Sequence, residues 1–150
     1  MDAAEGDGAI VNRLVFVSHG AKDTWVARQI ARRIVECGAV PFLAEADVAV
    51  GADFEDEILT FLRQADELVA LLTPSSLERP YVWAELGVAW GRRIPIVVLL
   101  WGLSAGELQG RPEVPVFIKQ RDSVLLNDVD QYFEQLRSRV QAQAGAGVAK

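Results

Sequence analysis

Short apolar runs alternate with amphipathic segments along most of the chain. Residues 14–18 are apolar on both faces, which is typical of a central strand in a parallel sheet. Residues 67–72 and 94–101 predict two further strands, of which the second is the most apolar. Residues 39–45 predict a brief strand that begins late or lies near a sheet edge, because Pro41 cannot donate to a ladder.

Helical periodicity marks the segments between and after these strands. The first predicted helix is capped by Asp23 or Thr24 and runs to about Glu36, with Gly38 as its stop signal. The other predicted helices cover residues 54–65, 81–90 (closed by Gly91) and 128–141.

The remaining segments carry weaker patterns. Residues 102–115 are punctuated by Gly and Pro and predict a long loop with at most one helical turn. The short runs VFI and SVLL offer one further strand or two. Residues 1–12 are expected to be a flexible leader and 142–150 a flexible tail, which leaves one domain over 13–141.

Strands that alternate with helices predict an α/β domain with a mainly parallel central sheet of about five strands flanked by helices. In such sheets ligands bind beyond the carboxyl ends of the strands. This rule gathers the loops at residues 18–23, 45–53 and 73–80, and the segment after Trp101, at one edge of the sheet.

Composition narrows the classes of partner. The net charge of -6 and pI of about 4.8 argue against nucleic acid or an anionic membrane surface. One cysteine and one histidine leave no internal disulfide and make a zinc site or a Cys–His catalytic pair unexpected. The longest apolar run is too short for a membrane span, and no signal peptide is visible, so a cytoplasmic protein is expected.

Several familiar motifs are absent. The sequence contains neither G-x-x-x-x-G-K-[ST] nor G-x-G-x-x-G, the two common phosphate-binding signatures. The serine-hydrolase elbow G-x-S-x-G is also missing. No metal or bound cofactor is therefore expected.

One carboxylate stands inside an almost wholly apolar helix. Glu85 has Tyr81 and Val88 among its neighbours three and four residues away. A charged side chain on such a surface needs either a partner or a chemical role. The sequence leaves both explanations open. Arg92 or Arg93 at the end of the helix can pair with Glu85, or Glu85 can act on a bound ligand.

Three segments resemble a known family. LVFVSHGAKD resembles the first box of Toll/interleukin-1 receptor (TIR) domains, and VGADFEDEIL resembles the end of their BB loop with the start of the next helix. LVALLTPSSLERPYVWAELGVAWGRRIPIVVLLW resembles the bacterial TIR pattern of strand, loop, W-x-x-x-E helix and strand. The resemblance extends from about residue 13 to 140 and implies a flavodoxin-like fold.

The resemblance also implies an activity. Many TIR domains hydrolyse or cyclise NAD+ with a glutamate in that helix, which corresponds to Glu85 here. NAD+ is then a substrate and not a cofactor. The aromatic residue four positions before the glutamate is Tyr81 and not the usual Trp, and the first loop lacks the run of basic residues found in some members. The candidate substrate-binding residues are Ser18, His19, Gly20, Lys22, Phe54, Ser75 and Tyr81.

A lone carboxylate is chemically sufficient for such a reaction. The nicotinamide of NAD+ leaves as a neutral amide, so it needs no general acid. The ribose develops positive charge, which one carboxylate can stabilise electrostatically, by holding ribose hydroxyls or as a transient nucleophile. Glycosidases that expel an alkoxide normally need a second carboxyl group.

Each candidate also has a structural interpretation. Ser18 and His19 can satisfy backbone groups at a strand end, and Ser75 with its neighbour Ser76 can cap the loop that precedes the helix. Phe54 can flank a ligand or pack. The tryptophans at 83 and 90 are expected in the core, and the one at 101 is expected to pack although it ends a strand at the ligand edge.

Three functions follow. The first is an NAD+ glycohydrolase or cyclase of bacterial antiphage defence or signalling, and the second is a non-catalytic TIR–TIR interaction module. The third is a nucleoside deoxyribosyltransferase-like N-glycosidase, which would share the fold and the lone glutamate. Self-association through Glu45–Asp53 is expected in the first two, and a separate sensor or effector protein is a further expected partner.

Overall fold

A parallel five-stranded sheet forms the centre of the protein. The computed structural model describes residues 12–43 and 54–149, with the backbone alone at 54, 55 and 146–149. The strands lie in the order β2-β1-β3-β4-β5, and every neighbouring pair is parallel. This is the strand order of flavodoxin-like folds, whose switch point lies between β1 and β3. The strands are β1 (Leu14–Ser18), β2 (Val40–Leu43), β3 (Glu67–Leu72), β4 (Ile96–Leu100) and β5 (Ser123–Leu125).

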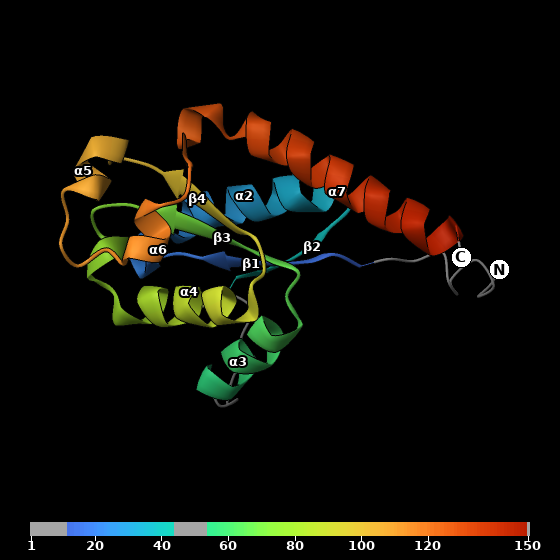
Figure 1. Ribbon diagram of the computed structural model, residues 1–150, viewed down its shortest axis with the longest axis horizontal. Coiled ribbons are helices and arrows are strands. Elements are labelled where there is room, and N and C mark those ends of the chain that lie inside the picture. Colours follow the sequence, from blue (N-terminus) through green and yellow to red (C-terminus); the bar gives the residue numbers. More distant parts are fainter. Residues whose placement is uncertain (1–11, 44–53, 150) are drawn as a thin grey trace.

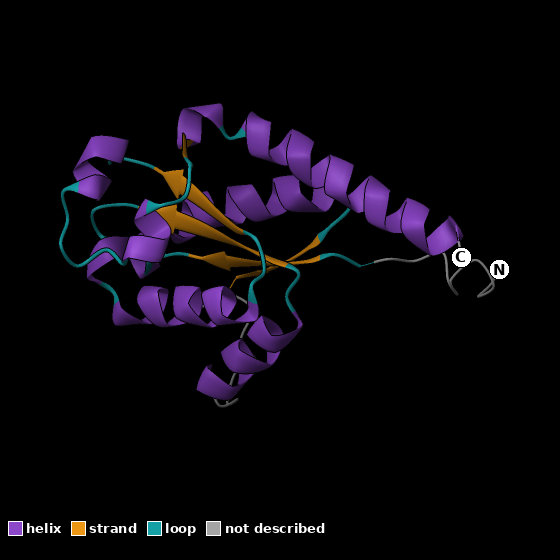
Figure 2. Cartoon of the chain, in the orientation of Figure 1, coloured by secondary structure: helices purple, strands orange, loops and turns teal. Residues whose placement is uncertain are grey.

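Helices cover both faces of this sheet, as Figures 1 and 2 show. One face packs against α2 (Thr24–Glu36) and α7 (Asp130–Ala149). The other packs against α3 (Phe54–Gln64), α4 (Pro80–Arg92) and α6 (Val116–Lys119), and the short α5 (Ala105–Gln109) lies near the carboxyl ends of the strands. Within the described ranges no helix is both long and apolar enough to cross a membrane.

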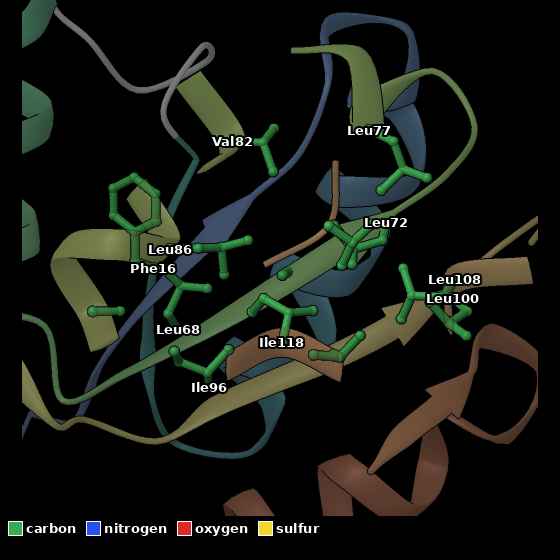
Figure 3. Close-up of a cluster of buried hydrophobic side chains, with 14 of the residues drawn as sticks. Phe16, Leu68, Leu72, Leu77, Val82, Leu86, Ile96, Leu100, Leu108 and Ile118 are labelled. Carbon is green, nitrogen blue, oxygen red and sulfur yellow. The ribbon is translucent and has the colours of Figure 1, made fainter. Parts of the chain in front are cut away.

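Two apolar cores result from this layering, one on each face. All six positions of β3 are buried, because β3 is central in the sheet and covered on both sides. Figure 3 shows the core on the α4 face, where Leu68 and Leu72 of β3 meet Leu86 of α4 and Ile118 of α6. These contacts fix α4 against the sheet and thereby set the position of its glutamate.

The structure confirms the predicted parallel α/β architecture and corrects several details. The run VFI forms the helix α6 and not a strand, because Pro115 sets an extended N-cap and the following residues close a helical turn. Helix α4 does not end at Gly91 but continues to Arg92. Helix α7 extends to Ala149 and so includes most of the predicted tail, a stretch in which alanines favour a helix although Gly145 and Gly147 disfavour it.

Two tryptophans are more exposed than expected. Trp90 is 54% exposed and Trp101 45% exposed. The buried stripe of α4 runs through Leu86 and Ala89, and Trp90 lies outside it. Trp83 does pack against the core, and its Nε1 donates a hydrogen bond to the carbonyl of Leu77.

Candidate active site

Ser18 and Glu85 meet at the carboxyl end of β1. Ser18 ends this strand beside Ala70 of β3, and Glu85 lies in the second turn of α4. The Ser18 hydroxyl donates a hydrogen bond of 2.6 Å to Oε1 of Glu85, across 67 residues of sequence. Both residues are buried, at 0% and 5% exposure. A short bond to a buried carboxylate fixes its orientation strongly.

Glu85 also lines a small cavity between α3 and α4, here called the Glu85 cavity. Its volume is about 190 Å³. Ordinary ligand sites measure roughly 300–1,000 Å³, so this cavity suits a ring-sized part of a larger molecule. Apart from the glutamate its walls are almost wholly apolar, formed by Ile58, Leu59 and Leu62 of α3 and by Tyr81, Ala84 and Val88 of α4.

The two arginines that the sequence offered as partners of Glu85 lie elsewhere. Arg92 points elsewhere, and its Nη1 donates to the carbonyls of Leu62 and Ala65, at 2.6 and 2.8 Å. Arg93 lies beyond the helix in a left-handed conformation and lines a different cavity. Glu85 accepts a hydrogen bond from the neutral hydroxyl of Ser18 and lines an apolar cavity.

A second polar cluster lies beside the first, at the switch point between β1 and β3. The Thr73 hydroxyl donates a 2.6 Å hydrogen bond to Oδ2 of buried Asp23. The Ser76 hydroxyl accepts a bond from the backbone N–H of Thr73, and the Ser76 N–H donates to the Thr73 hydroxyl. Gly20 packs against this turn, where a Cβ atom would lie 3.3 Å from the Cα of Ser76. The two loops are therefore locked together.

The other sequence-predicted residues lie at different depths around this edge. His19 is buried, with Nδ1 3.4 Å from the carbonyl of Val17. Lys22 is exposed in the turn after β1, and Ser75 is half-buried. Tyr81 is 48% exposed at the wall of the Glu85 cavity.

Two predicted features, the Phe54 side chain and the Glu45–Asp53 loop, lie outside the described residues. Ser75, proposed as a cap or a ribose contact, is not the residue that ties down the loop, because Ser76 makes the hydrogen bonds with Thr73. In the described ranges no three His, Cys, Asp or Glu side chains are grouped so that they could hold a metal ion.

Sequence reasoning missed the bond between Asp23 and Thr73. Asp23 was considered only as a helix cap, yet its side chain makes no capping bond in the structure. Fifty residues separate the two partners, so no local periodicity links them. The available signal was their shared position after strands 1 and 3, which already placed both at the ligand edge.

Comparison with known proteins identifies relatives of this chain. The family model described as "TIR domain" matches residues 15–139. A protein of Brachypodium distachyon, named as a probable 2′ cyclic ADP-D-ribose synthase, is 24% identical over 138 residues, covering 91% of this chain. The chain spans 60% of the length of that relative.

Solved structures share the fold at low sequence identity. The TIR domain of the Toll-related receptor TRR-2 from Hydra magnipapillata has a TM-score of 0.63 at 19% identity, covering 85% of this chain and 97% of that one. A 2-desoxiribosyltransferase from Leishmania mexicana has a TM-score of 0.59 at 14% identity, covering 81% of this chain and 97% of that one. The same backbone architecture thus occurs in a receptor domain and in a glycosyl-transferring enzyme.

Proposed function

The chain belongs to the TIR domain family, and from this premise we propose that it cleaves the nicotinamide–ribose bond of NAD+, with Glu85 as the catalytic carboxylate. The observation that carries the proposal is the hydrogen bond between Ser18 and the buried Glu85 at the wall of an apolar cavity. The name of the Brachypodium relative, a probable synthase of a cyclic ADP-ribose, supports the same chemistry.

The reaction needs a stabilised cation and not a proton donor. Nicotinamide is cationic while attached to ribose, and it departs as a neutral amide when the glycosidic bond electrons move onto its ring nitrogen. The anomeric carbon then carries oxocarbenium character. A carboxylate close to the ribose lowers the free energy of this charge, and more strongly where water is excluded.

In this proposal the side chains of the site have separate tasks. Ser18 holds Oε1 of Glu85, so the carboxylate does not have to reorganise as charge develops. The apolar Glu85 cavity accommodates one ring and keeps water from the reacting bond. Tyr81, His19, Gly20, Lys22, Ser75 and Phe54 are proposed to contact the remainder of the dinucleotide.

Completion of the site is proposed to require a second copy of the chain. A cavity of about 190 Å³ holds only part of NAD+, so the rest of the molecule must bind outside it. Residues Glu45–Asp53, outside the described ranges, are proposed to contribute to TIR–TIR contact. We propose a role in bacterial defence or signalling, in which a sensor or effector protein controls this assembly.

Release of nicotinamide from NAD+ tests the proposal. The purified chain and its Glu85→Gln variant are incubated with NAD+ at low and high protein concentration, and nicotinamide is quantified by chromatography. We expect release by the wild-type chain, abolished in the variant, with a specific activity that rises with protein concentration. Product analysis then separates free ADP-ribose from a cyclic isomer.

Two controls separate this function from the alternatives. Deoxynucleosides added as competitors should not reduce nicotinamide release, and the chain should not exchange their bases, as a deoxyribosyltransferase-like enzyme would. Circular dichroism should show that Glu85→Gln is folded. If the wild-type chain releases no nicotinamide at any concentration while it self-associates, the proposal fails and the interaction module replaces it.

A further inference from the structure

A second cavity lies at the other end of α4, away from the Glu85 cavity. Its volume is about 500 Å³, within the range of ordinary ligand sites. The residues that line it are Trp90, Gly91, Arg93, Ile94 and Arg121, and we call it the Trp90 cavity. None of these residues lines the Glu85 cavity, so the two hollows are separate.

An exposed indole ring forms the aromatic part of the Trp90 cavity. Trp90 stacks on Phe117 of α6, with ring centroids 4.8 Å apart and an interplanar angle of 10°. It nevertheless remains 54% exposed. The Phe117 ring holds the indole in place, so a flat ligand can stack on the remaining surface without first ordering the side chain.

Two guanidinium groups, those of Arg93 and Arg121, form the charged part of the Trp90 cavity. Arg121 lies with its Cζ 6.0 Å from the centroid of Phe117, and its Nη1 donates to the carbonyl of the same residue. Arg93 makes no side-chain hydrogen bond or ion pair with any described residue. Two positive charges at one cavity are unexpected in a chain with a net charge of -6, and guanidinium groups bind phosphate by paired hydrogen bonds.

The backbone at Arg93 gives an independent reason to look for a function there. Arg93 has a φ of 62° and occupies the left-handed position just after α4. The N–H of Arg93 bonds to the carbonyl of Trp90, and that of Ile94 to the carbonyl of Ala89, which is a Schellman ending. Glycine is the favoured residue at this position, and an L side chain there is strained. Among described residues Arg93 alone has a positive φ without being glycine.

We propose that the Trp90 cavity binds a nucleoside phosphate, with its base stacked on Trp90 and its phosphates held by Arg93 and Arg121. An aromatic surface next to two guanidinium groups matches a ligand that joins a flat ring to an anionic group. An arginine at this strained position then supplies a charge that a glycine would lack. The inference does not depend on NAD+ cleavage at Glu85.

Calorimetric titration with ADP, adenosine and pyrophosphate tests this inference on the full chain. We expect ADP to bind more tightly than either fragment, with an affinity that falls as salt rises. Arg93→Gly should weaken ADP binding at least about tenfold, while its unfolding midpoint equals or exceeds that of the wild type, because the left-handed strain is relieved. Trp90→Leu should weaken ADP but not pyrophosphate.

Two further variants keep the result specific. Arg32→Ala removes an equal charge from an exposed position on α2 and should leave ADP binding unchanged. Lys22→Ala removes a proposed contact to the remainder of the dinucleotide and should also retain ADP binding, which distinguishes the Trp90 cavity from the proposed NAD+ site. The inference is overturned if Arg93→Gly binds ADP as tightly as the wild type, or if the wild type shows no binding up to about 1 mM.

Discussion

Two glutamates are buried near opposite ends of the sheet, and their surroundings differ completely. Glu67, at the amino end of β3, is 0% exposed and is surrounded by donors. Its Oε1 accepts from Nε of Arg13 at 2.7 Å and from Nε of Arg139 at 2.9 Å. Its Oε2 accepts from Nη2 of Arg139 at 3.1 Å and from the Tyr132 hydroxyl at 2.6 Å. Glu85, near the carboxyl end of β1, has a serine hydroxyl on one oxygen and a cavity beside it.

The comparison shows which surroundings give a buried carboxylate a structural role and which make it suitable for catalysis. The two arginines neutralise Glu67, and its oxygens are saturated with hydrogen bonds that tie β3 to α7 and to the residue before β1. No ligand can approach it without breaking this network. Glu85 accepts a hydrogen bond from a neutral hydroxyl and lines an apolar cavity, through which a cationic ligand can approach the carboxylate. Burial alone does not distinguish the two, but the cavity beside Glu85 does.

The largest expected effect is the loss of catalysis in Glu85→Gln. We expect the turnover number for nicotinamide release to fall about 10³-fold, or about 4 kcal/mol in the activation barrier, because the amide cannot stabilise the ribosyl cation. The free energy of unfolding should change by less than about 1 kcal/mol, since the amide oxygen still accepts from Ser18. Urea denaturation beside the kinetics measures both. A variant that keeps most of its turnover would remove Glu85 from the chemistry.

The reverse outcome is expected for Glu67→Gln. This change removes the negative charge between Arg13 and Arg139 and should lower the free energy of unfolding by about 3 kcal/mol. Turnover of the folded variant should stay within a factor of about two, because Glu67 lies at the amino end of β3, away from the Glu85 cavity. Urea denaturation and nicotinamide release below the unfolding transition measure the two quantities. Equal stability of variant and wild type would show that the network is dispensable.

The contrast between these sites also marks what the sequence could predict. Local periodicity identified the strands and main helices, and the carboxyl-edge rule placed Ser18 at the same edge as the loop that leads into the helix of Glu85. The Glu67 network was missed, because its partners lie 54, 65 and 72 residues away and periodicity carries no such pairing. Glu67 itself was included in the predicted strand at 67–72 and was given no separate role.

Local signals also misled where two interpretations compete. The run VFI is too short for its apolar character to separate a strand from a helical turn. Gly91 is a common stop signal, yet the chain turns at Arg93, where the carbonyls of Ala89 and Trp90 accept the closing hydrogen bonds. Positions of elements therefore followed from sequence, while side-chain pairing and helix ends depended on tertiary contacts.

A smaller effect is expected from Ser18→Ala, which sharpens the role of the hydroxyl. Without the 2.6 Å bond the Glu85 carboxylate loses its fixed orientation, and we expect kcat/KM for NAD+ to fall about 30-fold, or about 2 kcal/mol. Ser138→Ala, at an exposed position on α7, is the matched control and should leave kcat/KM unchanged. If Ser18→Ala retains wild-type kcat/KM, the hydroxyl has only a structural role at the end of β1.

The smallest expected effect is the pH dependence that Glu67 confers on stability. Burial by itself raises the pKa of Glu67, but hydrogen bonds from Arg139, Tyr132 and Arg13 outweigh it and lower the pKa below the ordinary value of 4.5. A lowered folded pKa means that the contribution to stability is complete above that ordinary value, and is lost as the pH falls through the folded pKa.

The Glu67→Gln variant isolates this contribution, because glutamine takes up no proton in this range. The difference in unfolding free energy between wild type and variant should be constant from about pH 7 to pH 5 and should then narrow, by at most about 1.4 kcal/mol per pH unit for one proton. Urea denaturation across this range measures it.

For Glu85→Gln the difference in unfolding free energy from the wild type should be small at neutral pH, as expected for a carboxylate that contributes to chemistry more than to folding. A Glu67→Gln difference that stays constant down to about pH 3 would show that the arginines do not depend on the charge of Glu67, and the contrast between the two glutamates would then rest on hydrogen bonding alone.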